Sequence, residues 1–251
     1  MGKVSRQTIA IGILSQGWVA GWAIASLAEN PAHLQQLLIS QQCNGCDLER
    51  AVLSQTRLAG ASLERANLQN ANLQGSVLSN SSLQGANLTG ADLRAATLTR
   101  ANLNGATLVD SQLAGGHLAY ADLTQANLQG ADLSAAIAPN SVFAAADLTA
   151  ADLTSAVLIN ASFTHAILAE ADLQAADLTQ AYFIRTDLSA ANLRGVDLSR
   201  ARLIRSNLDG ADLTDAFLLG AITDTSTFID AIFCRTTMPD GTQNNDNCPT
   251  P

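Results

Sequence analysis

The side chains that could do chemistry lie mostly near the two ends of the 251-residue chain. Cys43 and Cys46 form a C-x-x-C pair, while Cys234 and Cys248 lie close to the other end. A C-x-x-C pair is typical of zinc sites and of redox centres, but a structural zinc site needs four ligands. His33 lies well before Cys43 in the sequence and completes neither pair. At this point the cysteines are compatible with zinc, redox chemistry or disulfides.

Catalytic motifs are absent from the sequence. It has no nucleophile elbow of the G-x-S-x-G type, no phosphate-binding loop and no H-E-x-x-H metal motif. These motifs place a nucleophile, a phosphate or a metal ion at a defined turn or helix, so their absence removes the best-known routes to catalysis. We therefore predict that the protein is no enzyme and that it has no catalytic residues, no cofactor and no metal site.

The first 28 residues have the features of a secretory signal peptide. Lys3 and Arg6 precede an uncharged, largely apolar run over residues 7–28, which ends with small residues at Ser26 and Ala28. A basic start, an apolar middle and small residues at the last and third-last positions predict cleavage after Ala28. A retained membrane anchor is the alternative, because about 20 uncharged residues can cross a bilayer.

Most of the chain, from Asp47 to Phe233, repeats a five-residue unit. Every fifth residue from Leu48 onward is Leu or Phe, except Ala138 and Thr223, and a small residue, usually Ala, stands two positions earlier. A period of five matches neither a helix nor a flat strand, so the chain must turn within each unit. The large and the small residue then face the same side, which indicates a coil of square cross-section with an apolar interior.

The tandem unit, A-[DN]-L-x-x, resembles the pentapeptide-repeat family over roughly three quarters of the chain. The resemblance implies an all-β fold, a right-handed quadrilateral β-helix with four units per coil and about nine coils, in which strands stack ~4.8 Å apart. Residues 33–38, 43–48 and 237–241 are similar to segments of exported cyanobacterial members. That similarity implies the periplasm or the thylakoid lumen.

Both ends of such a coil need a cover, because they expose apolar interior and unpaired strands. A short helix is predicted over residues 31–41, with Leu34, Leu37 and Leu38 on one face. We expect it to cap the first coil. The predicted division of the chain is a signal peptide at 1–28, an N-terminal helical cap at 29–46, the repeat coil at 47–233 and a C-terminal cap or tail at 234–251.

Export to an oxidising compartment favours disulfides over metal ligation for the four cysteines. A rod of about nine coils holds the two cysteine pairs far apart, at opposite ends. Each disulfide is therefore expected to form within a pair. The predicted disulfides join Cys43 to Cys46 and Cys234 to Cys248.

Four units per coil place the outward-facing residues in columns whose members are 20 residues apart. One column is polar and acidic, and it includes Asp92, Asp132, Asp152, Asp172 and Asp212. Another face is more apolar, with Val77, Ile137, Val157 and Phe217, and the face beside it carries Val142, Tyr182, Arg202 and Ile222. Stacked carboxylates could bind a divalent cation. We interpret both columns instead as possible surfaces for a protein partner.

The net charge of −9 disfavours binding to nucleic acid or to anionic lipid. We therefore predict a non-catalytic structural or protein-interaction scaffold in an extracytoplasmic compartment. Its partner is an unknown protein, it is a monomer or a homodimer, and it makes no membrane contact after signal cleavage. The resemblance also allows an alternative, a DNA-mimicking binder of a type II topoisomerase, although export would separate the two proteins.

Overall fold

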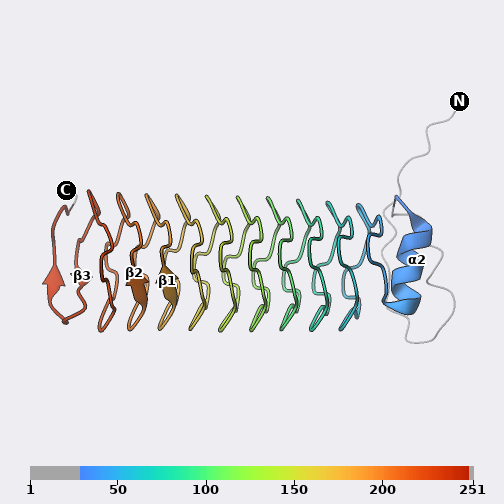
Figure 1. Ribbon diagram of the computed structural model, residues 1–251, viewed down its shortest axis with the longest axis horizontal. Coiled ribbons are helices and arrows are strands. Elements are labelled where there is room, and N and C mark those ends of the chain that lie inside the picture. The colour runs from blue at the N-terminus through green and yellow to red at the C-terminus, as the bar shows by residue number, and fades with distance from the viewer. Residues whose placement is uncertain (1–28, 249–251) are drawn as a thin grey trace, which may run out of the picture.

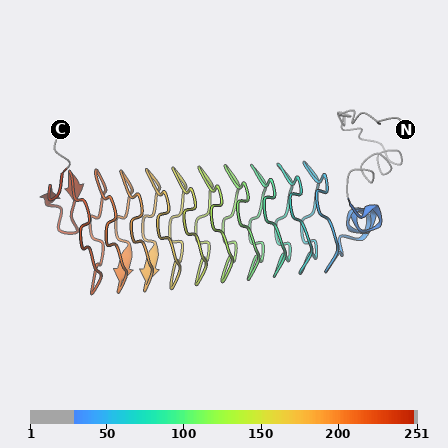
Figure 2. The ribbon, with the colours of Figure 1, turned by 90° about the horizontal axis from the view of Figure 1, so that it is seen from above.

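The computed structural model describes residues 29–248, which form a long regular coil with a helix at one end (Figure 1). Parallel backbone bridges join outward-facing residues that are 20 positions apart, from Gln42 with Ser62 to Phe217 with Thr237. One turn of the coil therefore contains four five-residue units. Figure 2, at right angles to the first view, shows the same even stacking along the rod. The predicted signal peptide, residues 1–28, lies outside the described residues.

Leu and Ala fill the inside of the coil because alternate positions of an extended segment point to the same side. Leu68 and Ala66 are fully buried, whereas Asn67 between them is partly exposed. The Leu68 N–H donates to the Asn87 carbonyl of the next coil at 2.7 Å, and the Asn87 N–H donates back to the Ala66 carbonyl at 2.9 Å. These reciprocal bonds link each coil to the next, so stability accumulates from contacts between neighbouring coils.

Each unit ends in a tight turn. The Ala71 N–H closes one of them by donating to the Leu68 carbonyl at 3.0 Å. The last residue of the unit has a positive φ, 64° at Gly90 and 55° at Ala150. This left-handed conformation costs a residue with a side chain about 1–2 kcal/mol. The cost explains why glycine recurs at the last position, although other residues also occupy it.

Three successive coils carry Phe in one inner column. The rings of Phe143 and Phe163 stack with centroids 4.9 Å apart, and those of Phe163 and Phe183 with centroids 5.0 Å apart. In the same segment the extended backbone lengthens into short strands, β1 (Tyr182–Ile184) and β2 (Arg202–Ile204), which pair in parallel. The aromatic column thus lies directly behind the side of the rod that β1 and β2 form.

The helix α2 (Pro31–Ser40) lies across the N-terminal end of the coil (Figures 1 and 2). The Asn30 side chain caps it by accepting a backbone N–H of the first turn at 3.3 Å. Leu34 and Leu37 are fully buried in the same apolar cluster as the coil interior. Leu38, which was expected on that face, is 38% exposed because it lies one position further round the helix.

A short hairpin, β3 (Thr236–Thr237) paired antiparallel with β4 (Gln243–Asn244), follows the last coil. Phe228 and Phe233 are partly buried and pack against the apolar cluster. Their rings lie 5.6 Å apart and tilted, so the interior ends on aromatic side chains rather than on an open row of leucines. Within residues 29–248, no helix is long and apolar enough to span a membrane.

Candidate interaction surfaces

The four cysteines form two disulfides, Cys43 with Cys46 and Cys234 with Cys248. Sulfur atoms in disulfides offer no thiolate to a metal ion. The side chains of the N-terminal pair are also buried, with Cys43 fully inaccessible and Cys46 4% exposed, so a redox partner has no access to that bond. Among the described residues, no cluster of three or more metal-ligating side chains forms. Of the three possibilities left by the sequence, the structure contains the disulfides.

His33 lies closer to the C-x-x-C segment than its distance in sequence suggested. Its Nδ1 accepts the backbone N–H of Asp47 at 2.9 Å, so it connects α2 to the start of the repeat. The helix brings this histidine back over the first coil, and its contact is structural.

Backbone pairing stacks the predicted acidic residues in register. Asp132 pairs with Asp152 and Asp152 with Asp172, while Asp92 and Asp212 lie two coils beyond them at either end. Each carboxylate accepts the backbone N–H two residues later, at 2.8 Å for Asp152, and so closes its own turn. We call the three consecutive members, Asp132, Asp152 and Asp172, the carboxylate ladder.

Arginines neutralise the two ends of the acidic column. Arg94 binds both carboxylate oxygens of Asp92, at 2.9 and 2.7 Å, and this hydrogen bonding holds the pKa of Asp92 below its usual value. Burial raises the pKa of Asp212, but hydrogen bonds from Thr214 and from Arg194, at 2.9 Å, outweigh it and leave the pKa lowered. Within residues 29–248, the carboxylate ladder has no such partner. The charge of this face is therefore concentrated in its middle.

Comparison with known families agrees with this geometry. A model of pentapeptide repeats matches in eight copies, over residues 46–85, 76–113, 108–143, 146–183 and 181–220. The chain belongs to the pentapeptide-repeat family. Members of this family fold as right-handed quadrilateral β-helices, and the 20-residue coil with four units is the same architecture.

Three solved pentapeptide-repeat structures illustrate the likeness. HetL of the cyanobacterium Nostoc sp., described as involved in heterocyst differentiation regulation, is 30% identical over 85% of this chain and 97% of its own, with a TM-score of 0.47. A protein of the Arabidopsis thaliana thylakoid lumen is 27% identical over 48% and 70%, with a TM-score of 0.22. Rfr23 of Cyanothece is 22% identical over 78% and 97%, with a TM-score of 0.17. No curated protein matches the sequence.

The apolar column of this pentapeptide-repeat protein is discontinuous. Ile137 pairs with Val157 in the next coil, but Asp177 and Asp197 separate this pair from Phe217, which is 52% exposed. Thr97 and His117 in turn separate the pair from Val77 on the other side. The apolar residues therefore form isolated spots, and only Ile137 with Val157 offers adjacent apolar rungs in that column.

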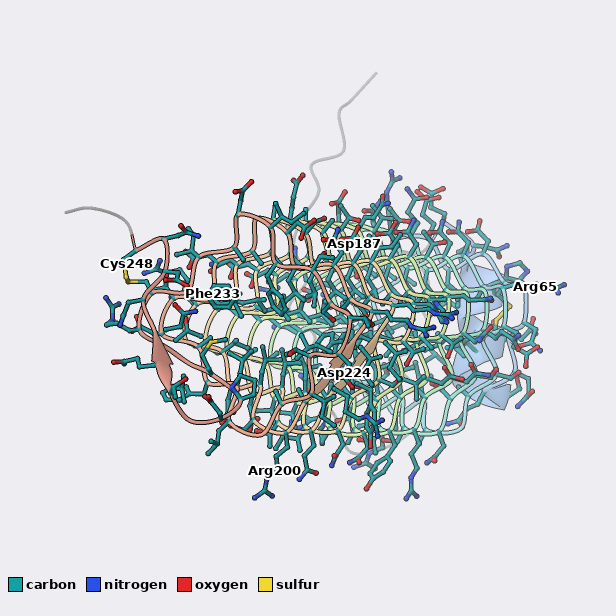
Figure 3. All side chains as sticks on the ribbon, turned by 60° about the vertical axis from the view of Figure 1, so that its left-hand side comes forward. Arg65, Asp187, Arg200, Asp224, Phe233 and Cys248 are labelled. Atoms are coloured by element: carbon teal, nitrogen blue, oxygen red, sulfur yellow. A yellow bond between two sulfur atoms is a disulfide. The ribbon has the colours of Figure 1, made fainter. Side chains whose placement is uncertain are left out.

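The next side of the pentapeptide-repeat rod, which carries the column of Val142, Tyr182, Arg202 and Ile222, has the most concentrated positive charge. Four exposed arginines gather around β1 and β2, and Figure 3 shows Arg200 projecting away from the coil. We call these four residues the arginine patch: Arg185, Arg200, Arg202 and Arg205. Sequence reasoning followed only the middle outward position of each unit, where Arg202 stands. The other three occupy turn positions, and reading those positions at the same 20-residue spacing would have found them.

The C-terminal hairpin of the rod contains a hollow whose lining is mostly polar. It has a volume of about 620 Å³ and is lined by eight residues from Met238 to Asp246. Its carboxylates are Asp240 and Asp246, and Asp240 closes a turn by accepting the Thr242 N–H at 2.9 Å. The lining contains no His, Cys or Lys. An acid alone, without a nucleophile or a base in reach, does not make a catalytic pair.

Proposed function

We propose that the protein is a non-catalytic structural or protein-interaction scaffold in an extracytoplasmic compartment. The shape of the rod supports the scaffold role most strongly. The repeat buries its apolar residues in the interior, and its outward-facing residues form four long sides that differ in charge. Repeat proteins of this kind use such extended surfaces for binding. The carboxylate ladder and the arginine patch are then the two sides on which a partner would find concentrated charge.

Two features support the extracytoplasmic location. The first 28 residues have a basic start and an apolar middle, which are typical of a signal peptide. Both cysteine pairs are bonded, and the described residues contain no free cysteine. Glutathione and thioredoxin keep cysteines reduced in the cytosol, so disulfides at both ends fit an oxidising compartment.

Crosslinking in the native compartment tests the scaffold role. Cells expressing the tagged protein are fractionated and crosslinked, and the captured neighbours are identified by mass spectrometry. The expected result is an extracytoplasmic protein that captures defined neighbours. A ladder variant, D132N/D152N/D172N, is compared with D177N/D197N on another face, which removes carboxylates elsewhere. A cytosolic protein would contradict the location, and a rod that captures no neighbour would contradict the scaffold.

The DNA-mimic alternative has a separate test. A DNA mimic presents regular negative charge to a DNA-binding partner, and the carboxylate ladder is a short regular array of that kind. The arginine patch on the same rod is unlike DNA. We expect the purified protein to leave the supercoiling activity of a bacterial type II topoisomerase unchanged, and concentration-dependent inhibition or protection would support the alternative.

A further inference from the structure

In the part of the chain that the structure describes, the arginine patch is a group of cations without ion-pair partners, although the net charge of the protein is −9. Arg185 and Arg205 occupy the same turn position in adjacent coils, because Ile184 pairs with Ile204 immediately before them. Arg200 and Arg202 lie across the same side. Within residues 29–248, none of the four makes an ion pair or a side-chain hydrogen bond. The ion pairs in this range involve the other arginines Arg50, Arg94, Arg194 and Arg235.

The backbone under the patch differs from the rest of the coil. In most units a backbone N–H closes the turn on the carbonyl of the inward residue, but after Phe183 and Leu203 the N–H groups of Thr186 and Ser206 donate instead to the hydroxyls of Ser206 and Ser226, at 3.4 and 3.0 Å. Ser206 Oγ donates to the Phe183 carbonyl and Ser226 Oγ to the Leu203 carbonyl, each at 2.7 Å. The chain stays extended for one more residue, which produces β1 and β2. Their half-exposed isoleucines form a short apolar strip between the arginines.

The carboxylate ladder lies on the opposite side of the same rod. Tyr182 in β1 follows Asp172 by ten residues, which is half of the 20-residue coil. Each ladder residue uses a carboxylate oxygen to close its own turn and is half-exposed. Over residues 29–248 the rod thus carries the arginine patch and the carboxylate ladder half a turn apart, and their charges form no ion pairs with each other or with neighbouring residues.

We propose that the arginine patch of one molecule docks on the carboxylate ladder of a second copy, with the two rods side by side. Both charge arrays repeat with the spacing of the coil, about 4.8 Å, so their rungs match when the two axes are aligned. The half-exposed carboxylates then meet guanidinium groups, whose forked donors suit carboxylate oxygens. The apolar strip of β1 and β2 contributes the desolvated centre that protein interfaces need.

The two docking sides are opposite each other, so the contact is heterologous. Each added molecule uses one of its two sides, so the row always keeps one free cationic side and one free anionic side at its two ends, and the association continues into lateral rows of rods. The inference depends on the proposed scaffold function in one respect, since it names a second copy as a partner. The net negative charge argues against a nucleic acid as the occupant of the patch.

Charge reversal tests the contact. Sedimentation velocity of the mature, disulfide-bonded protein is recorded from micromolar to millimolar concentration, at low and at high ionic strength. The wild type is expected to at least double its mean mass at low ionic strength and to return to monomer at high ionic strength, because salt screens exposed charges. R185E/R205E and D152R/D172R are each expected to remain monomeric in both conditions.

A combined variant separates a specific contact from general charge effects. R185E/R205E/D152R/D172R has the net charge of the wild type with the polarity of both sides exchanged, and it is expected to associate again. R185E/R205E/D177R/D197R has the same net charge, but its new arginines lie on a different side, and it is expected to stay monomeric. Circular dichroism checks that every variant is folded.

Three results would overturn the contact: a monomeric wild type at low ionic strength, association that survives high salt, or equal association of the two combined variants. A monomeric wild type leaves the scaffold proposal intact, because that proposal fails only when crosslinking captures no neighbour. The two failures are therefore distinguishable.

Discussion

The stacked phenylalanines allow the neighbour-coupled stability of the rod to be measured directly. Phe163 stacks on Phe143 and on Phe183, whereas each of these outer rings has one stacked neighbour. A stacked aromatic pair contributes about 0.5–1.5 kcal/mol beyond the burial of its surface. Phe163→Leu therefore removes about 1–3 kcal/mol of stacking, and Phe143→Leu about half of that. All three sites share the loss that comes from the smaller side chain, so the difference between variants isolates the stacking.

Urea denaturation at neutral pH, followed by far-ultraviolet circular dichroism, gives the free energy of unfolding of each variant. We expect Phe163→Leu to be less stable than either outer variant by about 1 kcal/mol. Double-mutant cycles are the control: Phe143 and Phe163 should be coupled, whereas Phe143 and Phe183, with a ring between them, should be additive. Equal losses at the three sites, or equal coupling of both pairs, would refute the argument that the stacks carry this energy.

Three further predictions concern the interior, the surface charge and the C-terminal disulfide. Ala151→Leu should overpack the narrow interior and lower the free energy of unfolding by ~1–3 kcal/mol, measured by urea denaturation; an unchanged midpoint would contradict the inward position of Ala151. The lowered pKa of Asp92 beside Arg94 means that its stabilising contribution is complete above the unfolded-state pKa and is lost as the pH falls through the lower folded-state value. The urea concentration at the unfolding midpoint should therefore decrease as the pH is lowered below about 4. In Asp92→Asn this decrease should be less steep. Removing the disulfide with C234A/C248A should lower the free energy of unfolding by about 3 kcal/mol, because the bond closes the loop between these two residues. Thiol titration of the denatured wild type should find no free thiol.

Local periodicity made the interior of the rod predictable. The rule that alternate residues of an extended segment face the same side assigned Leu68 and Ala66 to the core, and both are fully buried. The structure has a helix, α2 (Pro31–Ser40), where the sequence predicts one over residues 31–41, and its N-terminal cap and buried leucines follow from its own sequence. These features depend on residues within a few positions of one another, which a single sequence displays.

The surface was less predictable because it depends on side-chain conformations and on contacts between neighbouring coils. The acidic column could be listed from the sequence, but the pairing of Asp92 with Arg94 and of Asp212 with Arg194, and hence the isolation of the carboxylate ladder, required the side-chain positions. The column that was expected to be apolar is broken by Asp177 and Asp197, and it gives no continuous apolar surface.

The sequence by itself determined the five-residue unit, the buried residues and the family, since each follows from repetition along the chain. Only the tertiary structure decided which charged side chains pair with each other and which have no partner among the described residues. The turns at Phe183 and Leu203 open because the N–H groups of Thr186 and Ser206 donate to the hydroxyls of Ser206 and Ser226 in the following coil, and this lengthens β1 and β2 under the arginine patch. The closure of the coil then sets that patch and the carboxylate ladder on opposite sides, because half a coil separates them. No local pattern contains that relation.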